Sequence, residues 1–520
     1  MSKQSFIKGT MILLAAGLIN RILGFVPRIT LPRVIGAEGV GLYQLGYPLL
    51  IVLLTCITGG IPLAVAKLVA AAESDRNERK VRSILHLSLM CTLLLSLLFT
   101  GILLFGASWI SRTLLNDGRV YYTILAMSPM LLIIGISSVF RGYFQGRQNM
   151  TPTAMSQTVE TIVRIAAMLL FSYLLLPYGL PFAAAGAMFG VTVGEIGGLA
   201  VIVSQYLRSR RAYHALLSKE PPSNDAARPA SSLLRSLLRI AVPVTGSRLV
   251  GSGSYFLESV MTVQALAAAG VAAAVATTQY GTLQGMVIPV LLLPGVLTYA
   301  LSVSLVPSLS EAAARGDMRT IHKRLHQSLR LALVTGAPFA VFMYVLAEPI
   351  CYYLYNEPEV GAMLKMMAPV AVFLYFQSPL QAALQALDRP GAALLNTFYG
   401  AAIKLTLIFL LAAQQRFGIY GVVAAINVNI VLVTMLHWNS IVNFIKFRFP
   451  LLDIVKTAGA ACVVAFSAHY LYVTEWTPSP LLRFLTAGIG GIVLYLALTM
   501  ILKLIDKDDF GRLPFPRKKP

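Results

Sequence analysis

The sequence repeats itself at a fixed offset of 240 residues, without a gap and across nearly half of its length. Identical or similar pairs at this offset include Arg79/Arg319, His86/His326, Asn116/Asn356, Asp117/Glu357, Pro129/Pro369, Ser138/Ser378, Gln145/Gln385 and Arg164/Lys404. A duplicated chain of this kind forms two similar halves about a pseudo-twofold axis, and membrane transporters use the cavity between such halves for alternating access. The repeat therefore predicts a symmetric molecule with a central cavity.

The composition places both halves in a lipid bilayer. Of the 520 residues, 57% are hydrophobic and only 12% are charged, and the mean hydropathy is +0.74, so polar groups are too few to cover a soluble globule of this size. Apolar stretches of about 17 to 25 residues predict fourteen membrane-spanning helices. Their centres lie near residues 17, 55, 95, 130, 165, 192, 250, 290, 340, 372, 402, 430, 462 and 492. We therefore expect an all-α polytopic membrane protein.

The spacing of these helices, combined with the repeat, predicts the domain boundaries. The spans follow one another at about forty residues, so an offset of 240 residues equals six helices. We expect a six-helix bundle at residues 1–207, a cytoplasmic linker at 208–235, a second six-helix bundle at 236–445, and two extra helices with a basic tail at 446–520. The linker is the longest hydrophilic stretch and contains Pro221, Pro222 and Pro229, as a flexible connection would.

The net charge of +21 is explained by the loops on one side of the membrane. If the N-terminus lies inside, alternate loops contain 31 of the 42 lysine and arginine residues, whereas the opposite loops contain six. This positive-inside bias predicts that both termini of a multi-pass protein of the cell membrane are cytoplasmic. It also accounts for the charge without a nucleic-acid partner.

A few ionisable residues fall inside the predicted spans, where each costs roughly 2.5 to 3.5 kcal/mol and needs a partner or a wet cavity. They are Arg21, Glu160, Arg164, Glu195, Arg248, Glu258, Lys365 and Lys404. Glu160 and Arg164 are four residues apart, which suits a salt bridge along one helix face as well as a place in the cavity. The candidate carriers of a coupling proton or cation are Glu160, Glu195 and Glu258.

Arg21 and Arg248 begin similar tetrads, Arg-Ile-Leu-Gly and Arg-Leu-Val-Gly, in the first helix of each half. The duplication would place them symmetrically across the cavity. A guanidinium presents five donors in a plane and can bind phosphate oxygens in a bidentate manner, so we expect this pair to bind a diphosphate. The alternative is that each arginine caps a helix kink or extends its charge to the membrane surface.

Polar residues at four-residue spacing form stripes on two helices. One stripe consists of Gln377, Gln381 and Gln385. The corresponding face of the earlier helix carries Ser138, Arg141 and Gln145. Such stripes either line an aqueous pathway or make hydrogen bonds between helices, and the spacing fits both.

Glycines at the same spacing occur on the sixth predicted helix, at Gly186, Gly190, Gly194 and Gly198. A row of residues without side chains lets a neighbouring helix approach closely. We therefore expect this row to be a packing surface.

The sequence lacks the usual signatures of catalysis, nucleotide binding and metal binding. It has no GxxxxGK[ST] or HExxH motif and no GxSxG with plausible partners, so we expect neither an enzyme nor a cofactor nor a metal site. His322 and His326 have the spacing of metal ligands, but they lie in a basic cytoplasmic stretch without a nearby carboxylate. We expect them on a solvated face.

Several short runs resemble a known superfamily. KGT at 8–10, NRILGF at 20–25, RVIG at 33–36 and GVGLY at 39–43 are similar to the start of bacterial polysaccharide exporters of the multidrug/oligosaccharidyl-lipid/polysaccharide exporter superfamily. A more specific run, RGYFQG at 141–146 with QNM at 148–150, resembles the branch that endospore-forming Firmicutes use in sporulation.

The resemblance implies a V-shaped transporter of fourteen helices that flips undecaprenyl-diphosphate-linked sugars, such as the peptidoglycan precursor lipid II, to the outer leaflet. In a sporulation member this glycan would serve the spore cortex. Arg21 matches a helix-1 arginine that lipid II flippases use in their cavity. Their second helix-1 arginine falls at Pro27 in this chain, and Arg28, one place later, is the candidate substitute. This departure makes a different lipid-linked glycan possible.

The leading hypothesis is therefore a flippase in which Arg21, Arg248 and Arg28 bind the diphosphate while the two halves rock against each other. In the absence of an ATP site, an ion gradient, the membrane potential or product consumption would supply the energy. The expected partners are the lipid-linked oligosaccharide, the bilayer and cell-wall synthases. The alternatives are a cation-coupled multidrug antiporter, which arginines in the cavity disfavour, a polytopic glycan polymerase or ligase, and a scaffold for cell-wall enzymes.

Overall fold

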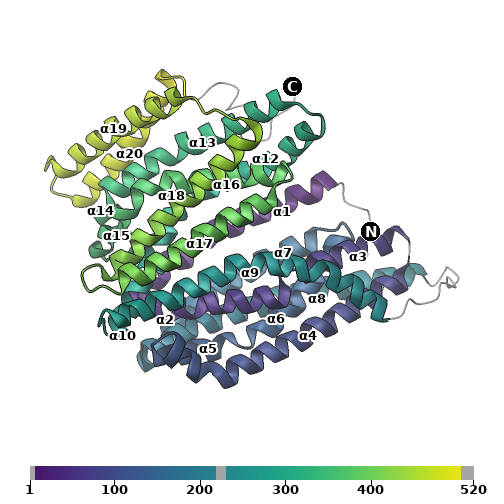
Figure 1. Ribbon diagram of the computed structural model, residues 1–520. Coiled ribbons are helices and arrows are strands. Elements are labelled where there is room, and N and C mark those ends of the chain that lie inside the picture. The colour runs from purple at the N-terminus through teal and green to yellow at the C-terminus, as the bar shows by residue number, and fades with distance from the viewer. Residues whose placement is uncertain (1–5, 76, 218–229, 505–520) are drawn as a thin grey trace. The chain divides into compact units, whose positions relative to one another are not determined.

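A computed structural model of the chain describes residues 6–75, 77–217 and 230–504, and these residues form helices joined by short connections, without a strand among them (Figure 1). The helices up to residue 217 are α1 (Phe6–Leu23), α2 (Phe25–Thr58), α3 (Ile61–Ser74), α4 (Glu78–Trp109), α5 (Tyr121–Met127), α6 (Met130–Gly146), α7 (Thr151–Leu175) and α8 (Leu180–Leu217). The next are α9 (Ala230–Ala268), α10 (Ala273–Gly281), α11 (Ile288–Leu292), α12 (Gly295–Ala314), α13 (Met318–Val345) and α14 (Ala347–Tyr355). The last are α15 (Gly361–Met367), α16 (Ala371–Ala386), α17 (Pro390–Ala412), α18 (Gly418–Ile445), α19 (Leu451–Val473) and α20 (Pro480–Ile501).

The helices have the length and composition of membrane spans. Within the described residues, eleven helical stretches are long and apolar enough to cross a membrane. The first, Met11–Ser74, contains the expected centres near residues 17 and 55, and the other ten contain one expected centre each. The two remaining centres, near residues 250 and 290, lie in α9 and α11. The all-α polytopic architecture is confirmed, and its helices are consistent with fourteen crossings.

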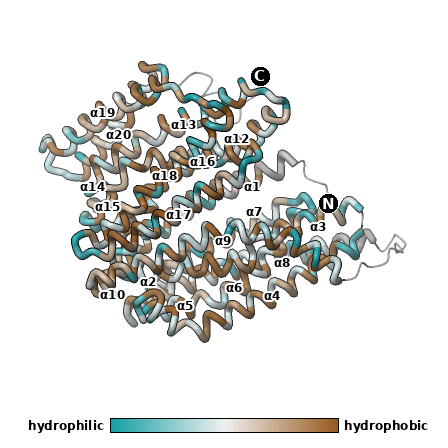
Figure 2. Tube along the Cα trace, in the orientation of Figure 1, coloured by the Kyte–Doolittle hydropathy of each residue, from teal (hydrophilic) through white to brown (hydrophobic). Residues whose placement is uncertain are grey.

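Hydrophobic residues lie along the lengths of the helices, and many hydrophilic residues lie at their ends (Figure 2). On α20, for example, Ile489, Val493 and Ile501 are 61%, 61% and 73% exposed, whereas Tyr495 on another face is 3% exposed and its hydroxyl donates to the Val334 carbonyl. Large exposed apolar side chains on a helix of membrane length are explained by contact with lipid.

The repeat at 240 residues is also a repeat of helix boundaries. α4 and α13 begin 240 residues apart, and the residue before each caps its helix. The Asn77 side chain accepts a hydrogen bond from the Lys80 amide at 2.9 Å, and the Asp317 side chain accepts one from the Thr320 amide at 3.0 Å. Each cap satisfies an amide that the first helical turn leaves without a partner.

Unusual backbone conformations recur at the same offset. Asn116 and Asn356 have positive φ angles of 52° and 62°, and Gln148 and Asp388 have positive φ angles of 55° and 56°. A left-handed conformation is uncommon for residues with a side chain, so its recurrence at both pairs is a structural feature that the two copies share rather than a coincidence. The two copies of the sequence repeat therefore share turns as well as helices.

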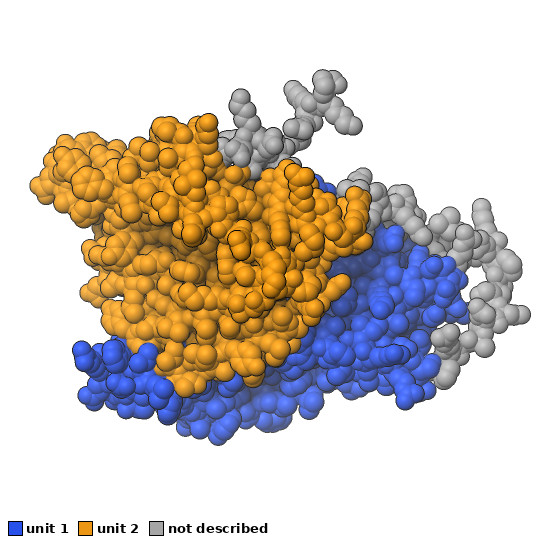
Figure 3. Space-filling model, turned by 45° about the horizontal axis from the view of Figure 1, so that its top comes forward, with its two compact units in different colours: residues 1–286, 408–419 blue, residues 287–407, 420–520 orange. Residues whose placement is uncertain are grey.

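The chain divides into two compact units, shown separately in Figure 3. Unit 1 contains residues 1–286 and 408–419, and unit 2 contains residues 287–407 and 420–520. Helix continues into both ends of the predicted linker, up to Leu217 and from Ala230, and residues 218–229 lie outside the described residues. The bundle boundaries that follow from the sequence repeat stay a prediction.

Two glycines shape the start of unit 1. Gly24 separates α1 from α2. Gly36, inside α2, has φ 67° and ψ 177°, a conformation that a residue with a Cβ atom rarely adopts. The chain therefore turns sharply at Gly36, so residues before it continue the first span and residues after it form the second.

The second span packs tightly against α10 within unit 1. A Cβ atom on Gly41 would lie 2.1 Å from the Thr277 carbonyl oxygen, and one on Gly281 would lie 2.3 Å from the Ala37 carbonyl oxygen. Backbone atoms of the two helices are therefore in direct contact, which the absence of side chains at these glycines allows.

The predicted glycine row on α8 is a packing surface against α7. A Cβ atom on Gly186 would lie 2.6 Å from the Phe171 carbonyl oxygen, and one on Gly190 would lie 2.3 Å from the Met168 backbone. The later glycines face two charged residues, because a Cβ on Gly194 would lie 2.5 Å from the Arg164 Cβ and one on Gly198 would lie 2.9 Å from the Glu160 Cβ. These distances confirm the packing role.

The two histidines of α13 are not on a solvated face, which corrects that expectation. His322 Nε2 lies 2.8 Å from the Ile445 carbonyl oxygen, and His326 Nε2 lies 3.0 Å from Asp453 Oδ2. The side chains of His326 and Asp453 are 27% and 17% exposed. Asp453 is 127 residues away in the sequence, so the chain fold supplies the carboxylate that the local sequence lacks.

Candidate functional site

Four charged residues on three helices of unit 1 form a buried cluster. The Arg141 Nη2 atom of α6 lies 2.7 Å from Glu160 Oε2 of α7 and 3.9 Å from Glu195 Oε2 of α8. Arg164 Nη1 lies 3.3 Å from the other oxygen of Glu160. Glu160 and Glu195 are 7% and 6% exposed. Two arginines and two glutamates together carry no net charge, which reduces the cost of burying them.

The sequence explains how this cluster comes together. Glu160 and Arg164 are one helical turn apart on α7, as predicted, and the glycine row on α8 brings that face of α7 close to Glu195. Arg141 was placed by the sequence on a polar stripe, and the structure shows that it is the closest basic partner of Glu160. The cluster lies about 14 Å along α7 from Thr151, since nine residues of helix rise about 1.5 Å each.

Glu258, the third predicted carboxylate, lies in a different part of unit 1. It is 6% exposed on α9, and its Oε1 accepts a hydrogen bond of 2.8 Å from Gln284 Nε2. Gln284 belongs to a π-helical turn, Thr282–Val287, and such turns often occur at functional positions. Glu258 therefore has an amide donor from a neighbouring element, whereas Glu160 is paired with two arginines.

The three predicted phosphate-binding arginines are exposed on unit 1. Arg21 lies in the last turn of α1, Arg28 in α2 with its guanidinium 5.7 Å from the centre of the Phe25 ring, and Arg248 in α9. Arg21 lies beside the junction at Gly24, and Arg248 lies five residues after Pro243 inside α9, so a kink-capping role fits the position of either arginine.

The glutamine stripe of α16 has two kinds of members. Gln377 Nε2 donates to the Ile430 carbonyl of α18 at 3.0 Å, which is a hydrogen bond between helices. Gln381 and Gln385 are exposed. The hydrogen-bond interpretation therefore holds for Gln377, and the pathway interpretation of Gln381 and Gln385 stays a prediction.

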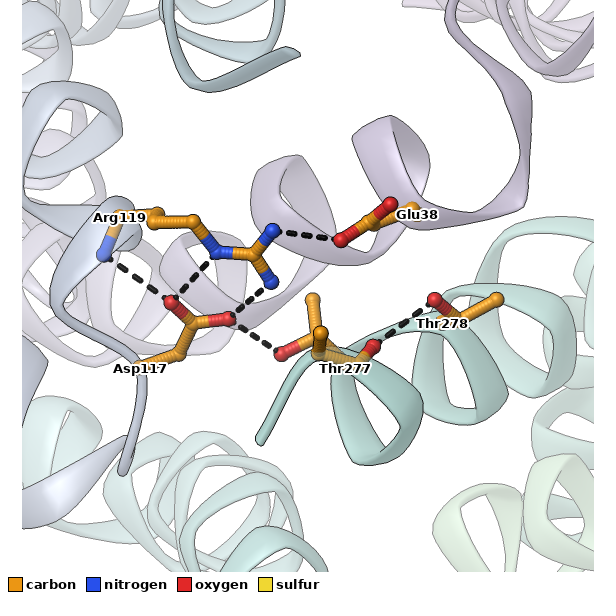
Figure 4. A network of polar contacts seen from close by, with 6 residues as sticks. Glu38, Asp117, Arg119, Thr277 and Thr278 are labelled. Atoms are coloured by element: carbon orange, nitrogen blue, oxygen red, sulfur yellow. Dashed lines mark hydrogen bonds and ion pairs between the residues drawn. The ribbon is translucent and has the colours of Figure 1, made fainter. Parts of the chain in front are cut away.

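A polar network that the sequence did not predict joins three segments of unit 1 (Figure 4). Asp117 accepts from the Arg119 backbone amide and Nε, each at 3.0 Å, and from Arg119 Nη2 at 2.8 Å. Arg119 Nη1 also lies 2.5 Å from Glu38 Oε1 of α2, and the Thr277 hydroxyl of α10 donates to Asp117 Oδ2 at 2.7 Å. The repeat aligns Asp117 with Glu357, and this match was the one sequence signal for an acidic group here. The repeat gave no signal for its basic partner, because position 359 is Glu where the first copy has Arg119.

Asp117 should contribute to stability in a pH-dependent manner. Burial alone would raise the pKa of Asp117, but hydrogen bonds from Arg119 and Thr277 outweigh burial and hold this pKa below its usual value. A carboxyl with a lowered pKa stabilises the fold above the pKa of the unfolded chain, about 3.9, and loses this effect as the pH falls through its lower folded-state pKa.

We therefore expect Asp117→Asn to destabilise the detergent-solubilised protein by about 1–3 kcal/mol at neutral pH. Its melting temperature should approach that of the parent protein as the pH falls below about 4. Thermal unfolding of both proteins across this pH range measures the difference. A gap that stays constant down to the lowest pH at which both proteins fold would contradict this account.

The architecture is that of a multi-pass helical transporter, and comparisons identify the family. The chain belongs to the polysaccharide biosynthesis protein family, whose model matches residues 6–313. A second family model, MatE, matches residues 243–410. The chain is 38% identical to the stage V sporulation protein B of Bacillus subtilis (strain 168) over 99% of its own length and 98% of that protein. It is 28% identical to the lipid II flippase MurJ of the same organism, over 78% of this chain and 77% of that protein.

Solved structures share the fold. A lipid II flippase MurJ in an inward closed conformation has a TM-score of 0.71 and 15% identity, and the alignment covers 96% of this chain and all of that chain. An inward-facing multidrug resistance MATE family transporter has a TM-score of 0.64 and 15% identity, with 82% of this chain and 95% of that chain covered. These likenesses confirm the predicted transporter fold.

Proposed function

We propose that this protein is a flippase that moves an undecaprenyl-diphosphate-linked glycan, lipid II or a related peptidoglycan precursor, from the cytoplasmic to the outer leaflet. The observation that carries the proposal is the similarity over nearly the whole chain to stage V sporulation protein B, together with the similarity to a lipid II flippase. The sporulation relative favours a role in the spore cortex. Cell-wall synthases that consume the glycan are the proposed downstream partners.

The substrate diphosphate would be held by Arg21 and Arg248, with Arg28 as a third cation. All three arginines are exposed, and a guanidinium suits bidentate contact with phosphate oxygens. Of the three predicted coupling carboxylates, we propose Glu160 and Glu195, which share one charged cluster, for this role.

The charge distribution supports cytoplasmic termini. In that orientation the network of Glu38, Asp117, Arg119 and Thr277 lies at the outer ends of its helices. Alternating access requires the outer end of the transporter to open and close. We propose that this network holds α10 against α2 while the outer end is closed, and that its hydrogen bonds break when that end opens.

The test of the function is a leaflet assay. The full-length protein is reconstituted into vesicles that contain lipid II, and accessibility of the headgroup from outside is measured with and without protein. We expect the protein to accelerate exchange of lipid II between the leaflets. Exchange at the protein-free rate for lipid II and for other undecaprenyl-linked glycans would contradict the proposal.

A cation-coupled multidrug antiporter is the second candidate, since the MatE model matches residues 243–410. Exposed arginines near the start of unit 1 make binding of a cationic drug less favourable than binding of a diphosphate. Drug resistance on overexpression, without any exchange of lipid-linked glycans, would favour the antiporter. Formation of a sugar bond by the purified protein would instead favour a polymerase or ligase.

A further inference from the structure

We propose that Glu160 and Glu195 together form one proton-binding site, in which a single proton is shared by two buried carboxylates and its binding and release are coupled to transport. This inference rests on the proposed flippase function and deepens it, because it names the coupling ion and the residues that carry it. It also excludes Glu258 from that role.

The first argument is that one carboxylate oxygen in the cluster lacks a donor. Glu195 Oε2 is buried and accepts no hydrogen bond from the described residues, since Arg141 Nη2 is 3.9 Å away from it and much closer, at 2.7 Å, to Glu160 Oε2. A buried carboxylate oxygen without a donor is costly. A proton bound to Oε2 would turn this oxygen into a donor toward the neighbouring carboxylate.

The second argument is the set of charges that surround Glu195. Arg141 approaches from α6, and Glu160 and Arg164 approach from α7; Glu160 is the ionisable neighbour with the strongest interaction. From α2, Tyr43 lies within electrostatic reach of Arg164. Two carboxylates in one site repel each other when both are ionised, and a proton shared between them would remove that repulsion.

α1 packs against α7 and carries Arg21 in its last turn, and α5 packs against α8 with its ionisable groups far from this site. They are Tyr121 and Tyr122, and the ring of Tyr122 packs against Phe182 at 4.5 Å between centroids. Phe182 and Glu195 are thirteen residues apart on α8, which corresponds to about 20 Å of helix. The proton would therefore be shared by Glu160 and Glu195, while Arg141 and Arg164 stay charged beside it.

The chemistry of the cluster favours a proton over a metal cation. The described residues contain no group of three or more His, Cys, Asp or Glu side chains placed to hold a metal ion. The two carboxylates are already balanced by two guanidinium groups, which would repel a further cation. A proton needs only a single oxygen, with which it forms one O–H bond. The side chain of Arg164, 29% exposed, reaches the edge of the cluster, and water would supply and receive the proton there.

The third argument comes from the second copy of the repeat. Gln381 and Gly400 stand 240 residues after Arg141 and Glu160. The positions 239 and 240 residues after Glu195 are Thr434 and Met435. A helix pair of this kind therefore forms without either acid, so packing alone does not explain why the first copy contains both.

The test begins with proton binding in the full-length protein in detergent. Infrared difference spectra between alkaline and mildly acidic buffers, both above about pH 5 so that exposed carboxylates stay ionised, should contain the carbonyl stretch of a protonated carboxylic acid. We expect Glu195→Gln to remove this band. Glu160→Gln should remove it as well, because its amide can donate to Glu195 and the shared proton is no longer needed.

Glu258→Gln is the matched control, since it neutralises another buried membrane carboxylate and should retain the band. Persistence of the band in folded Glu195→Gln, or its loss in Glu258→Gln alone, would overturn the proposal. Monodisperse elution of each variant in size-exclusion chromatography shows that it folds. If Glu195→Gln does not fold, the Glu160→Gln spectrum decides in its place: loss of the band supports the proposal, and persistence of the band overturns it.

A second measurement links the site to transport. In vesicles, an imposed proton gradient should change the rate of lipid II exchange by the parent protein and by Glu258→Gln, but not by Glu195→Gln. An undiminished gradient effect in Glu195→Gln would contradict coupling at this site. If the parent protein exchanges no lipid-linked glycan, the flippase function fails, whereas the infrared result still decides whether the pair binds a proton.

Discussion

Replacing Gly190 with valine is expected to prevent unit 1 from folding, with a destabilisation of more than about 3 kcal/mol. A Cβ atom at this position would lie 2.3 Å from both N and Cα of Met168 and 2.6 Å from the carbonyl carbon of Ala167. These are backbone atoms, which cannot rotate away as the end of a side chain can. α7 and α8 would have to separate, and the yield of monodisperse protein after extraction should fall sharply.

The matched control is Gly101→Val on α4. A Cβ atom at Gly101 has nothing within 4 Å and valine is a better helix former than glycine, so the same substitution should change the stability by less than about 1 kcal/mol. Gly197→Ala is an intermediate case, since its nearest neighbour is a methyl group of Val163 at 3.3 Å. If Gly190→Val elutes and melts like Gly101→Val, the close packing of α7 and α8 is wrong.

The double variant Arg21→Ala with Arg248→Ala is expected to lose nearly all exchange of lipid II in vesicles. A hydrogen bond to a charged group contributes about 1.5–3 kcal/mol, so each single variant should reduce the rate at limiting substrate by about 10- to 100-fold. Lysine at either position keeps the charge but loses the bidentate geometry, so it should restore part of the rate.

Arg315→Ala is the matched control for lost positive charge. Arg315 is 73% exposed and pairs with Glu311 on the same helix, which is a contact of little energetic value. It should exchange lipid II at the parental rate. Parental exchange by the double variant, at equal amounts of folded protein, would show that neither arginine binds the diphosphate. The same experiment with Arg28→Ala tests the substitute for the second helix-1 cation.

Some of the buried cluster was predictable, and some was not. Glu160 and Arg164 are a local pair, because a spacing of four residues on a helix places two side chains together whatever surrounds them. The glycine row predicted that α8 has a close neighbour, but not that this neighbour is α7. The contact of Arg141 with Glu160 joins separate helices, and no local spacing encodes it.

The Asp117 network and the two histidines of α13 show the same limit. Asp117 and Thr277 are 160 residues apart, and His326 and Asp453 are 127 residues apart. Their hydrogen bonds depend on how helices meet at their ends. The local sequence around His326 contains no carboxylate, so the expectation of a solvated face was wrong.

The sequence alone determined the membrane location, the helical architecture and the repeat of 240 residues. These properties follow from hydropathy, helix length and local similarity, which act over a few residues to a few tens of residues. Tertiary structure alone decided which buried charges meet, because a helix offers several polar faces and the choice of neighbour is made by packing. The pairing of Glu160 and Glu195 about Arg141, apart from Glu258, is the clearest result of that choice.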